Sequence, residues 1–228
     1  MKNLVVLSGA GISAESGIKT FRDSNGLWED HDIMEVASPQ GWEKNPQKVL
    51  DFYNARRRQL FEVSPNDAHK ALAELEKYYQ VNIITQNVDD LHERAGSSKV
   101  LHLHGELLSV RSVKNPNLVY KWEKDLQIGD LAEDKSQLRP DIVWFGEEVP
   151  FLKEAIYLIK RTHVLIIIGT SLQVYPAASL FTYAPKDTLI YYIDPMAKNA
   201  RMPKNIQCIN DSAVNAMQNL MPRLIEIA

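Results

Sequence analysis

The stretch VVLSGAGISAESGIKTFR (residues 5–22) starts as an apolar run and breaks into a glycine turn. The run predicts a buried strand, and residues 9–14 behind it fit the pattern G-x-G-x-x-G/A. Gly9 permits a tight turn there, and Gly11 lets backbone N–H groups approach a pyrophosphate. An ordinary strand-to-helix turn has the same composition, so the pattern alone leaves both interpretations open. The second strand with an acidic end that dehydrogenases carry is missing from residues 26–42, which disfavours hydride transfer.

Short apolar runs elsewhere predict the rest of a sheet: NLVVL (3–7), VNIIT (81–85), VLIII (164–168), TLIYYI (188–193) and IQCI (206–209). They are rich in β-branched residues and end in turn formers, as strands buried on both faces do. Helical patterns at residues 65–79 and 213–227 alternate with them. We therefore expect an α/β fold, a Rossmann-like parallel sheet with helices on both faces, whose polar strand ends converge on one site.

Two stretches do not fit this sheet. Residues 20–61 are expected to hold a loop and a helix, and residues 105–146 show no clear period. Together they predict a smaller module folded against a Rossmann-like core of residues 1–19, 62–104 and 147–228. The whole chain would then form one domain.

The composition is that of an ordinary globular protein, with 45% apolar and 24% charged residues and a net charge of −3. No block of like charges indicates a nucleic-acid or membrane-surface contact, and no apolar stretch could span a bilayer. Cys208 is the only cysteine, which excludes an internal disulfide and a cysteine-rich zinc site. Its strand-like setting predicts a buried, inert thiol. We expect a cytoplasmic monomer that binds neither nucleic acid nor membrane.

Three hydrogen-bonding side chains follow the second interior strand, in TQNVDDLHERAG (85–96). The amides of Gln86 and Asn87 suit a carboxamide or sugar hydroxyls, and the carboxylate of Asp89 suits an amide donor. An Asx-rich loop that caps the next helix would have the same residues. These residues alone leave both interpretations open.

The segment VLHLHGE (100–106) alternates with period 2, which predicts that His102 and His104 share one face of a short strand. Histidine titrates near neutrality and is the usual general base, although a histidine on a strand is often structural. Gly105 would let a ligand approach closely, which makes His104 the stronger catalytic candidate.

The segment VLDFYNARRRQLF (49–61) is predicted to be helical, with Tyr53 and Arg56 on its apolar stripe. The simpler interpretation is an arginine that snorkels from the helix edge. Alternatively, the pair offers a phenol and a guanidinium, three residues apart on one face, to a bound carboxylate.

Two more motifs lie towards the carboxyl end. RPDIVWFGE (139–147) is aromatic and apolar, and fits either a core strand or an exposed edge that pairs with an extended peptide. GTSLQVYPAA (169–178) is a second Gly/Ser turn behind a strand, which suits phosphate or ribose.

In order and spacing, five motifs resemble those of the sirtuins, which are NAD-dependent protein deacylases. The similarity runs from about residue 4 to about residue 195. FYNARRRQ (52–59) is similar to the Tyr-x-x-Arg segment of the branch that removes acidic acyl groups, especially its bacterial members. The five motifs are GAGISAESGIKTFR (9–22), TQNVDDLHERAG (85–96), HLHGEL (102–107), RPDIVWFGE (139–147) and GTSLQVYPAA (169–178).

The resemblance implies NAD as the co-substrate. It assigns the pyrophosphate to the first glycine turn, the nicotinamide ribose to Phe21 and Arg22, and the carboxamide to Asn87 and Asp89. It assigns phosphate and ribose to the second Gly/Ser turn and the adenosine ribose to Asp194. The implied NAD-binding residues are Gly9, Ala10, Gly11, Ser13, Phe21, Arg22, Gln86, Asn87, Asp89, Gly169, Thr170, Ser171 and Asp194.

The resemblance also implies the reaction and its partners. His104 matches the catalytic histidine, which takes a proton from a ribose hydroxyl after the substrate amide oxygen has displaced nicotinamide. The partners are acylated-lysine proteins or peptides, and the products are free lysine and O-acyl-ADP-ribose. The implied substrate-binding residues are Val143 and Phe145 in the acyl-lysine tunnel, Gly146 and Glu147 on the substrate backbone, and Tyr53 and Arg56 on a succinyl carboxylate.

Zinc marks one departure from the family. Sirtuins usually carry a structural zinc ion on two Cys-x-x-Cys pairs after the catalytic histidine, but residues 105–146 contain no cysteine. RSVKNPN (111–117) and AEDKSQL (132–138) stand near where the pairs would be. We predict no bound metal and a module held together by packing. The expected packing residues are Val113, Leu118, Tyr120, Trp122 and Leu126.

We therefore predict an NAD-dependent lysine deacylase that removes acetyl and succinyl groups. One alternative is NAD cleavage or ADP-ribosyl transfer on the same site. The other is a non-catalytic NAD-sensing module, which would not need a histidine at the end of a strand.

Overall fold

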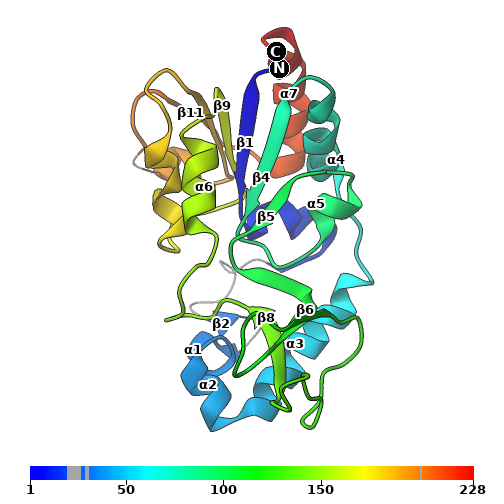
Figure 1. Cartoon of the computed structure of the whole chain (residues 1–228). Helices are drawn as coiled ribbons and strands as arrows, with labels where there is room; N and C mark the ends of the chain where they lie inside the picture. Colours follow the sequence, from blue (N-terminus) through cyan, green and yellow to red (C-terminus); the bar gives the residue numbers. More distant parts are fainter. Residues whose placement is uncertain (20–26, 29–30, 201) are drawn as a thin grey trace.

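The computed structural model describes residues 1–19, 27–28, 31–200 and 202–228 of the chain. They form two parts, an upper one around a six-stranded sheet and a lower one around a three-stranded sheet (Figure 1). Both chain ends lie at the far end of the upper part. Among these residues, no helix combines the length and the apolar character needed to cross a membrane.

The upper sheet has six strands: β1 (Asn3–Ser8), β4 (Gln80–Thr85), β5 (Val100–His102), β9 (Val164–Ile168), β10 (Leu189–Ile193) and β11 (Ile206–Ile209). All run parallel, in the order β11-β10-β9-β1-β4-β5, which confirms the predicted sheet and all five predicted runs. The chain grows outward from β1 to β5 and then returns to β9 on the other side of β1. In open parallel sheets, ligands bind in the crevice beside such a reversal.

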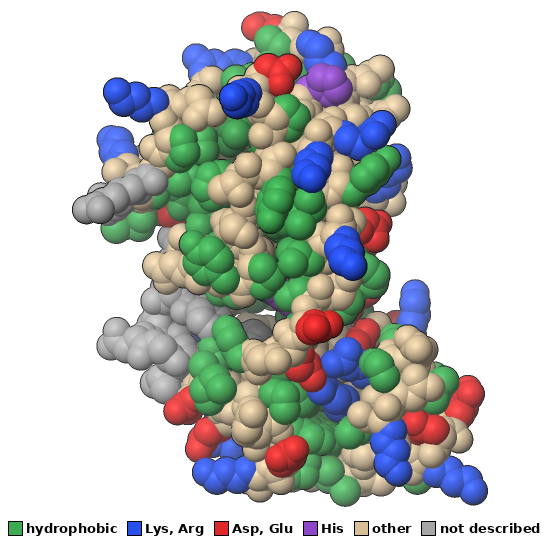
Figure 2. Space-filling model, turned by 60° about the vertical axis from the view of Figure 1, so that its left-hand side comes forward, with side chains coloured by type: hydrophobic (Ala, Val, Ile, Leu, Met, Phe, Trp, Pro, Cys, Tyr) green, Lys and Arg blue, Asp and Glu red, His purple; other side chains and the backbone are tan. Residues whose placement is uncertain are grey.

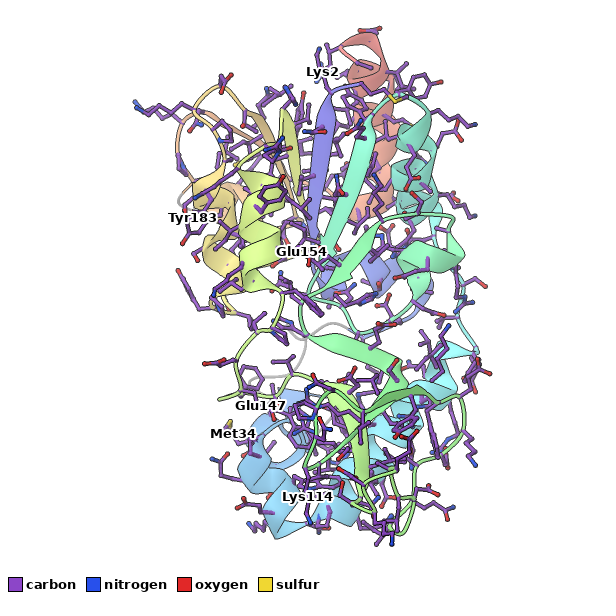
Figure 3. All side chains as sticks on the ribbon, viewed as in Figure 1. Lys2, Met34, Lys114, Glu147, Glu154 and Tyr183 are labelled. Carbon is purple, nitrogen blue, oxygen red and sulfur yellow. The ribbon has the colours of Figure 1, made fainter. Side chains whose placement is uncertain are left out.

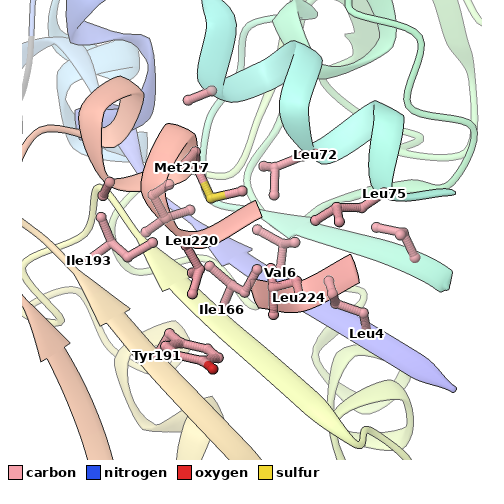
Figure 4. Close-up of a cluster of buried hydrophobic side chains, with 14 of the residues drawn as sticks. Leu4, Val6, Leu72, Leu75, Ile166, Tyr191, Ile193, Met217, Leu220 and Leu224 are labelled. Carbon is pink, nitrogen blue, oxygen red and sulfur yellow. The ribbon is translucent and has the colours of Figure 1, made fainter. Parts of the chain in front are cut away.

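Helices cover both faces of this sheet, as predicted: η1 (Ala10–Ser16), α4 (Asp67–Glu74), η2 (Leu75–Lys77), α5 (Leu91–Arg94), α6 (Leu152–Ile159), η3 (Ala177–Tyr183), η4 (Ala197–Asn199) and α7 (Ala213–Glu226), where η marks a 3₁₀ helix. On one face, Leu72 of α4 and Met217 of α7 pack over Val6 (Figure 4). On the other face, α6 and η3 cover the opposite side chains. Helices α4 and α7 start where Asn66 and Ser212 cap their first N–H groups.

The lower part contains β2 (Leu27–Trp28), β3 (His31–Asp32), α1 (Ile33–Val36), α2 (Pro39–Lys44), α3 (Pro46–Leu60), β6 (Gly105–Ser112), β7 (Val119–Lys121) and β8 (Leu138–Ile142). Three helices follow one another where we expected a single helix, because Asn45 ends α2 and also caps the start of α3. Strands β7, β6 and β8 form an antiparallel sheet. Its alternation is hidden in the sequence because Ser109, Ser112 and Arg139 are polar and yet buried.

A small apolar core holds the lower sheet against α3. Leu50, Val110, Leu126 and Leu138 are buried in it, and Leu118, Tyr120 and Trp122 pack around them. Four of the five predicted packing residues are therefore in place. The fifth prediction, Val113, is wrong: this side chain is 44% exposed. At the end of β6 it is the neighbouring Ser112 that turns inward.

A cluster of three polar side chains joins the loops of residues 111–117 and 132–138. The hydroxyl of Ser112 donates to Asp134 at 2.7 Å and lies 2.6 Å from the hydroxyl of Ser136, which itself is 2.6 Å from Asp134. Ser112 also accepts two backbone N–H groups from its own loop. These hydrogen bonds hold the Asp134 pKa below its usual value, with Ser136 as the largest cause. We call this cluster the Ser–Asp–Ser clasp.

The prediction that Cys208 is buried is wrong. This residue does lie in a strand, β11, but its side chain is exposed. The strand forms one edge of the upper sheet, and Cys208 belongs to neither of the apolar clusters that cover the two faces. Short apolar runs predict strands well, but they do not reveal which strand forms the edge.

Candidate active site

A cavity of about 1300 Å³ lies where the carboxyl ends of the upper strands meet the lower part. Figure 2 shows the molecule hollowed between its two parts. Phe21 and Arg22 lie outside the described residues, and Ser13 is buried behind the wall. All the other predicted site residues line the cavity: Gly9, Ala10, Gly11, Tyr53, Arg56, Gln86, Asn87, Asp89, His104, Val143, Phe145, Gly146, Glu147, Gly169, Thr170, Ser171 and Asp194.

Two glycine turns form the floor of the cavity, behind β1 and β9. The N–H of Gly11 donates to the carbonyl of Gly169 at 2.8 Å. A Cβ on Gly11 would lie 2.7 Å from the Cα of Gly169, and Gly169 itself has a φ of +65°. Neither position tolerates a side chain, so the backbone faces the cavity without side chains at the point where the strand order reverses. Such a floor suits close approach of a phosphate.

A buried hydrogen-bond chain links Asn87, Ser13 and Asp89 at the inner wall. The amide of Asn87 donates to the Ser13 hydroxyl at 3.1 Å, and this hydroxyl donates to Asp89 at 3.0 Å. The other oxygen of Asp89 accepts the N–H of Leu91, the first residue of α5, as in an Asx turn. Burial raises the pKa of Asp89 to about 6. This loop forms a turn before α5, whose N-cap residue Asp90 makes no side-chain cap, and it presents polar groups to the cavity.

Sequence reasoning missed two histidines behind this chain. The Nε2 atom of His69 lies 3.5 Å from the Ser13 hydroxyl, the rings of His69 and His92 meet edge to face at 4.9 Å, and Nε2 of His92 lies 2.9 Å from the hydroxyl of Ser8. Burial lowers the pKa of His69 to about 4 and that of His92 well below its usual value, so both rings are neutral. The sequence did contain one signal for His69: it lies on the apolar stripe of the helix predicted at residues 65–79, which indicates a buried ring.

His104 lies in the bend between β5 and β6, beyond the end of the strand on which we expected it. Its Nδ1 atom is 3.1 Å from the carbonyl oxygen of Gln86. A carbonyl can only accept, so Nδ1 carries the proton and Nε2 keeps its lone pair. Burial lowers the pKa of His104, which keeps the ring neutral and able to take up a proton at neutral pH.

His102 has a different, structural environment. Its Nε2 atom lies 2.8 Å from Glu93, and its Nδ1 atom lies 3.0 Å from the carbonyl oxygen of Asn87. Burial opposes the charged form, but the hydrogen bond and the charge of Glu93 outweigh it and raise the pKa of His102. Both of its nitrogens are engaged within the fold, which leaves His104 as the histidine on the cavity wall.

Tyr53 and Arg56 of α3 line the part of the cavity that belongs to the lower part. Tyr53 is fully buried, and burial raises its pKa, so the phenol stays protonated. Arg56 donates to the carbonyl of Phe52 at 2.9 Å, and its guanidinium lies 3.4 Å from the centre of the Phe52 ring. The neighbouring Arg57 turns away and donates to the carbonyl of Leu107, which ties α3 to β6.

The segment after β8 runs along the cavity between the two parts. The N–H of Val143 donates to the carbonyl of His104, and the N–H of Phe145 donates to that of Ala37. Gly146 has a φ of +92°, which favours glycine. Glu147, labelled in Figure 3, donates its backbone N–H to the carbonyl of Trp144. Its backbone carbonyl is then the main-chain group of Glu147 that could still pair with a peptide.

Residues 105–146, all of which the structure describes, offer no zinc-binding set that resembles the one usual in sirtuins. Residues 105–146 contain no cysteine, and the two loops concerned carry the Ser–Asp–Ser clasp. In the part of the chain that the structure describes, no three His, Cys, Asp or Glu side chains come together in a way that could hold a metal ion. Serine hydroxyls and one carboxylate are poor zinc ligands beside thiolates and imidazoles.

Curated relatives cover the whole chain. It is 82% identical over 228 residues to an NAD-dependent protein deacylase of Helicobacter pylori (strain J99), covering 100% of this chain and 97% of the relative. It is 83% identical to the protein of the same name from another Helicobacter pylori strain, covering 100% of both. A Bacteroides thetaiotaomicron NAD-dependent protein deacylase is 49% identical, with 99% of each chain covered.

Solved structures agree with the sequence relatives. A complex of a Sir2 homologue with NAD superposes with a TM-score of 0.86 at 40% identity, over 99% of this chain and 90% of the other. A complex of Sir2 with a p53 peptide and NAD+ gives 0.78 at 31% identity, over 96% and 92%. The sequence profile described as "Sir2 family" matches residues 9–176. The chain belongs to the Sir2 family.

Proposed function

We propose that this chain, an NAD-dependent protein deacylase, acts on acylated lysine side chains of proteins and peptides and accepts acidic acyl groups such as succinyl. One observation carries the proposal. A neutral histidine, a side-chain-free double glycine floor and a Tyr–Arg pair line the same cavity, although they come from distant parts of the chain. A non-catalytic NAD sensor would need only the floor.

The residues around the floor fit the parts of NAD. The bare backbone at Gly9, Gly11 and Gly169 suits the pyrophosphate, as glycine turns at strand ends do. Asn87 and Asp89 supply an amide and a carboxylate, complementary to the carboxamide of nicotinamide. Because NAD is consumed in the reaction, these residues hold a co-substrate.

His104 is the proton acceptor in this proposal. With Nδ1–H fixed on the Gln86 carbonyl, Nε2 is the nitrogen left to take a proton from a ribose hydroxyl. The substrate amide oxygen first displaces nicotinamide at the anomeric carbon of the ribose, and the deprotonated hydroxyl then attacks the former amide carbon. The C–N bond to the lysine breaks and the free amine leaves, while a water molecule supplies the oxygen that completes O-acyl-ADP-ribose. The rest of the cavity holds amide and ribose together, and such positioning can contribute roughly 7–11 kcal/mol to lowering a barrier.

Tyr53 and Arg56 would bind the carboxylate of an acidic acyl group. A protonated phenol donates one hydrogen bond, and a guanidinium adds charge-assisted ones. Burial of Tyr53 excludes water from this contact and so strengthens it. An acetyl group ends before it could reach such a pair, so the pair should discriminate between acyl groups.

The test uses purified protein, NAD and one peptide that carries acetyl-lysine, succinyl-lysine or free lysine, followed by mass spectrometry. The variant is Arg56→Met, and the matched control is Arg58→Met, an exposed arginine of the same helix that pairs with Asp125. We expect acyl loss equal to the acyl-ADP-ribose formed. Arg56→Met should reduce succinyl removal about 10-fold to 100-fold, as loss of a charge-assisted contact does, and leave acetyl removal within about 2-fold.

Other outcomes identify the alternatives. Nicotinamide release without acyl loss would indicate NAD cleavage or ADP-ribosyl transfer. NAD binding without turnover would indicate a sensor. Equal losses for both acyl groups in Arg56→Met would remove the acidic preference and leave the deacylase activity standing.

A further inference from the structure

The indole of Trp144 donates a hydrogen bond to the phenol of Tyr53. The distance from Nε1 to the phenolic oxygen is 3.1 Å, and the side chains are 2% and 0% exposed. The two residues come from separate elements, α3 and the segment after β8. A buried indole N–H requires an acceptor, and the phenolic oxygen supplies it.

Trp144 is itself held from two sides. The guanidinium of Arg139 lies 3.3 Å from the centre of its ring, and its backbone N–H donates to Glu147 at 2.8 Å. Arg139 and Glu147 close the clamp with two hydrogen bonds, of 2.7 and 2.9 Å. Burial opposes the charge on Glu147, but Arg139 outweighs it and keeps the pKa of this carboxyl low. The indole therefore has little freedom to turn away from Tyr53.

The direction of this hydrogen bond decides what Tyr53 can offer. Indole has only a donor, so the phenolic oxygen is the acceptor of the contact. The phenol proton must then point elsewhere in the plane of the ring. If the neighbour were an acceptor, the phenol could turn its proton towards that neighbour and away from a ligand. Trp144 offers no acceptor, so the Tyr53 proton cannot be lost to it in this way.

We propose that Trp144 is a specificity-determining positioning residue, which holds the Tyr53 phenol as a hydrogen-bond donor towards a carboxylate at the end of the acyl chain. This inference rests on the proposed use of acidic acyl groups. It predicts that Trp144 affects the choice of acyl group through Tyr53, without touching the reacting atoms.

The experiment compares kcat/KM for succinyl-lysine and acetyl-lysine forms of one peptide in the full chain. Trp144→Phe removes the N–H and keeps an aromatic ring. Trp122→Phe is the matched control, since it makes the same exchange in the lower part of the molecule but in a different apolar cluster from that of Trp144. We expect Trp144→Phe to lower succinyl kcat/KM about 5-fold to 10-fold, mainly through KM, as loss of one buried hydrogen bond would. Acetyl kcat/KM should stay within about 2-fold, and Trp122→Phe should change neither of the two kcat/KM values by more than that.

The double variant Tyr53→Phe/Trp144→Phe tests the route of the effect. If Trp144 acts through the phenol, the second substitution adds nothing to the loss in Tyr53→Phe. Equal losses for both acyl groups in Trp144→Phe, or additive losses in the double variant, would overturn the inference. If Trp144→Phe fails to fold, Glu147→Gln loosens the clamp with the indole in place and should shift the succinyl-to-acetyl ratio in the same direction. An unchanged ratio in that variant would count against the role.

The proposed function can fail separately. If Arg56→Met and Tyr53→Phe leave the succinyl-to-acetyl ratio unchanged, the acidic preference is wrong and this role of Trp144 falls with it. If those two variants shift the ratio and Trp144→Phe does not, only the role of Trp144 is wrong.

Discussion

The hydroxyl of Ser13 donates a 3.0 Å hydrogen bond to the carboxylate of Asp89 at the inner end of the cavity. The bond favours the charged form, yet burial dominates and raises the Asp89 pKa from 3.8 to about 6. The folded chain therefore binds this proton more tightly than the unfolded chain. Its contribution to stability is complete below about pH 3.8 and is lost as the pH rises through about 6.

Asp89→Asn should therefore make the protein more stable at neutral pH while it abolishes turnover. We expect a gain of about 2 kcal/mol in the free energy of unfolding at pH 7.5, shrinking by about 1 kcal/mol at pH 5, where the wild-type carboxyl is already mostly protonated. Urea unfolding at the two pH values measures both. A loss of stability at pH 7.5 would show that the charge is well compensated in the fold.

His104→Ala should abolish acyl removal and leave NAD binding intact, because the ring acts on a proton and is not part of the glycine floor. The wild-type pH profile of kcat/KM should fall on the acid side with a midpoint below 6.5, since burial lowers the pKa of this histidine and only the neutral ring accepts a proton. Calorimetric NAD titration and rates between pH 5 and 8 test the two parts. Turnover that survives in His104→Ala would exclude His104 as the base.

Gly11→Ala should remove NAD binding and destabilise the fold. Its Cβ would meet backbone atoms of Gly169 at 2.7 Å, and backbone cannot yield as a flexible side chain can. We expect a cost of about 1–3 kcal/mol, as for overpacked cores. Gly129→Ala is the control: its φ of +99° brings strain, but nothing lies within 4 Å of the added carbon. Thermal unfolding with and without NAD should show a ligand-induced shift in the control alone.

Ser112→Ala should loosen the lower part by opening the Ser–Asp–Ser clasp. The serine is 1% exposed, and its loss leaves Asp134, Ser136 and two backbone N–H groups short of a partner. Of these groups only Ser136 belongs to a buried residue, and water can solvate the exposed Asp134, so we expect a cost of about 1 kcal/mol, at the low end of the range for unsatisfied buried groups. Urea unfolding measures this cost, with the exposed neighbour Glu133→Ala as the control.

The same comparison tests the prediction that no zinc is bound. A chelator should leave the wild-type unfolding midpoint unchanged, and metal analysis of the purified protein should find less than stoichiometric zinc. A midpoint that falls with the chelator would reveal a metal-dependent fold despite the missing cysteines.

The upper sheet could be predicted because each of its central strands is a plain apolar run with a polar end. The carboxyl ends of parallel strands meet at one edge, so the wall residues from Gly9 to Asp194 could be placed together from sequence alone. The lower sheet could not be predicted, because Ser109, Ser112 and Arg139 break the alternation of apolar and polar residues. Ser112 has two of its partners, Asp134 and Ser136, in another loop, and only the folded chain brings them together.

The pattern of apolar and polar residues also failed to predict contacts that depend on a side chain's neighbours and not on its own polarity. The apolar stripe on α3 correctly predicted that Tyr53 lies on the apolar face of the helix, where it is buried. It gave no sign that Trp144, ninety-one residues away, donates a hydrogen bond to Tyr53. His69 and His92 look like unrelated histidines in the sequence, yet their rings are in contact. Each of these relationships needs two elements to be docked before it exists.

The central place of β1 has a consequence for synthesis on the ribosome. This strand is made before both of its neighbours, and one of its edges can pair as soon as β4 emerges from the ribosome. Its other edge pairs with β9, so it stays open until residues 164–168 have been made. Until then the nascent chain carries an unpaired apolar strand edge, which is prone to wrong pairing. Since the floor needs Gly169 against Gly11, a nascent chain that has not yet reached residue 169 cannot form the surface proposed for NAD.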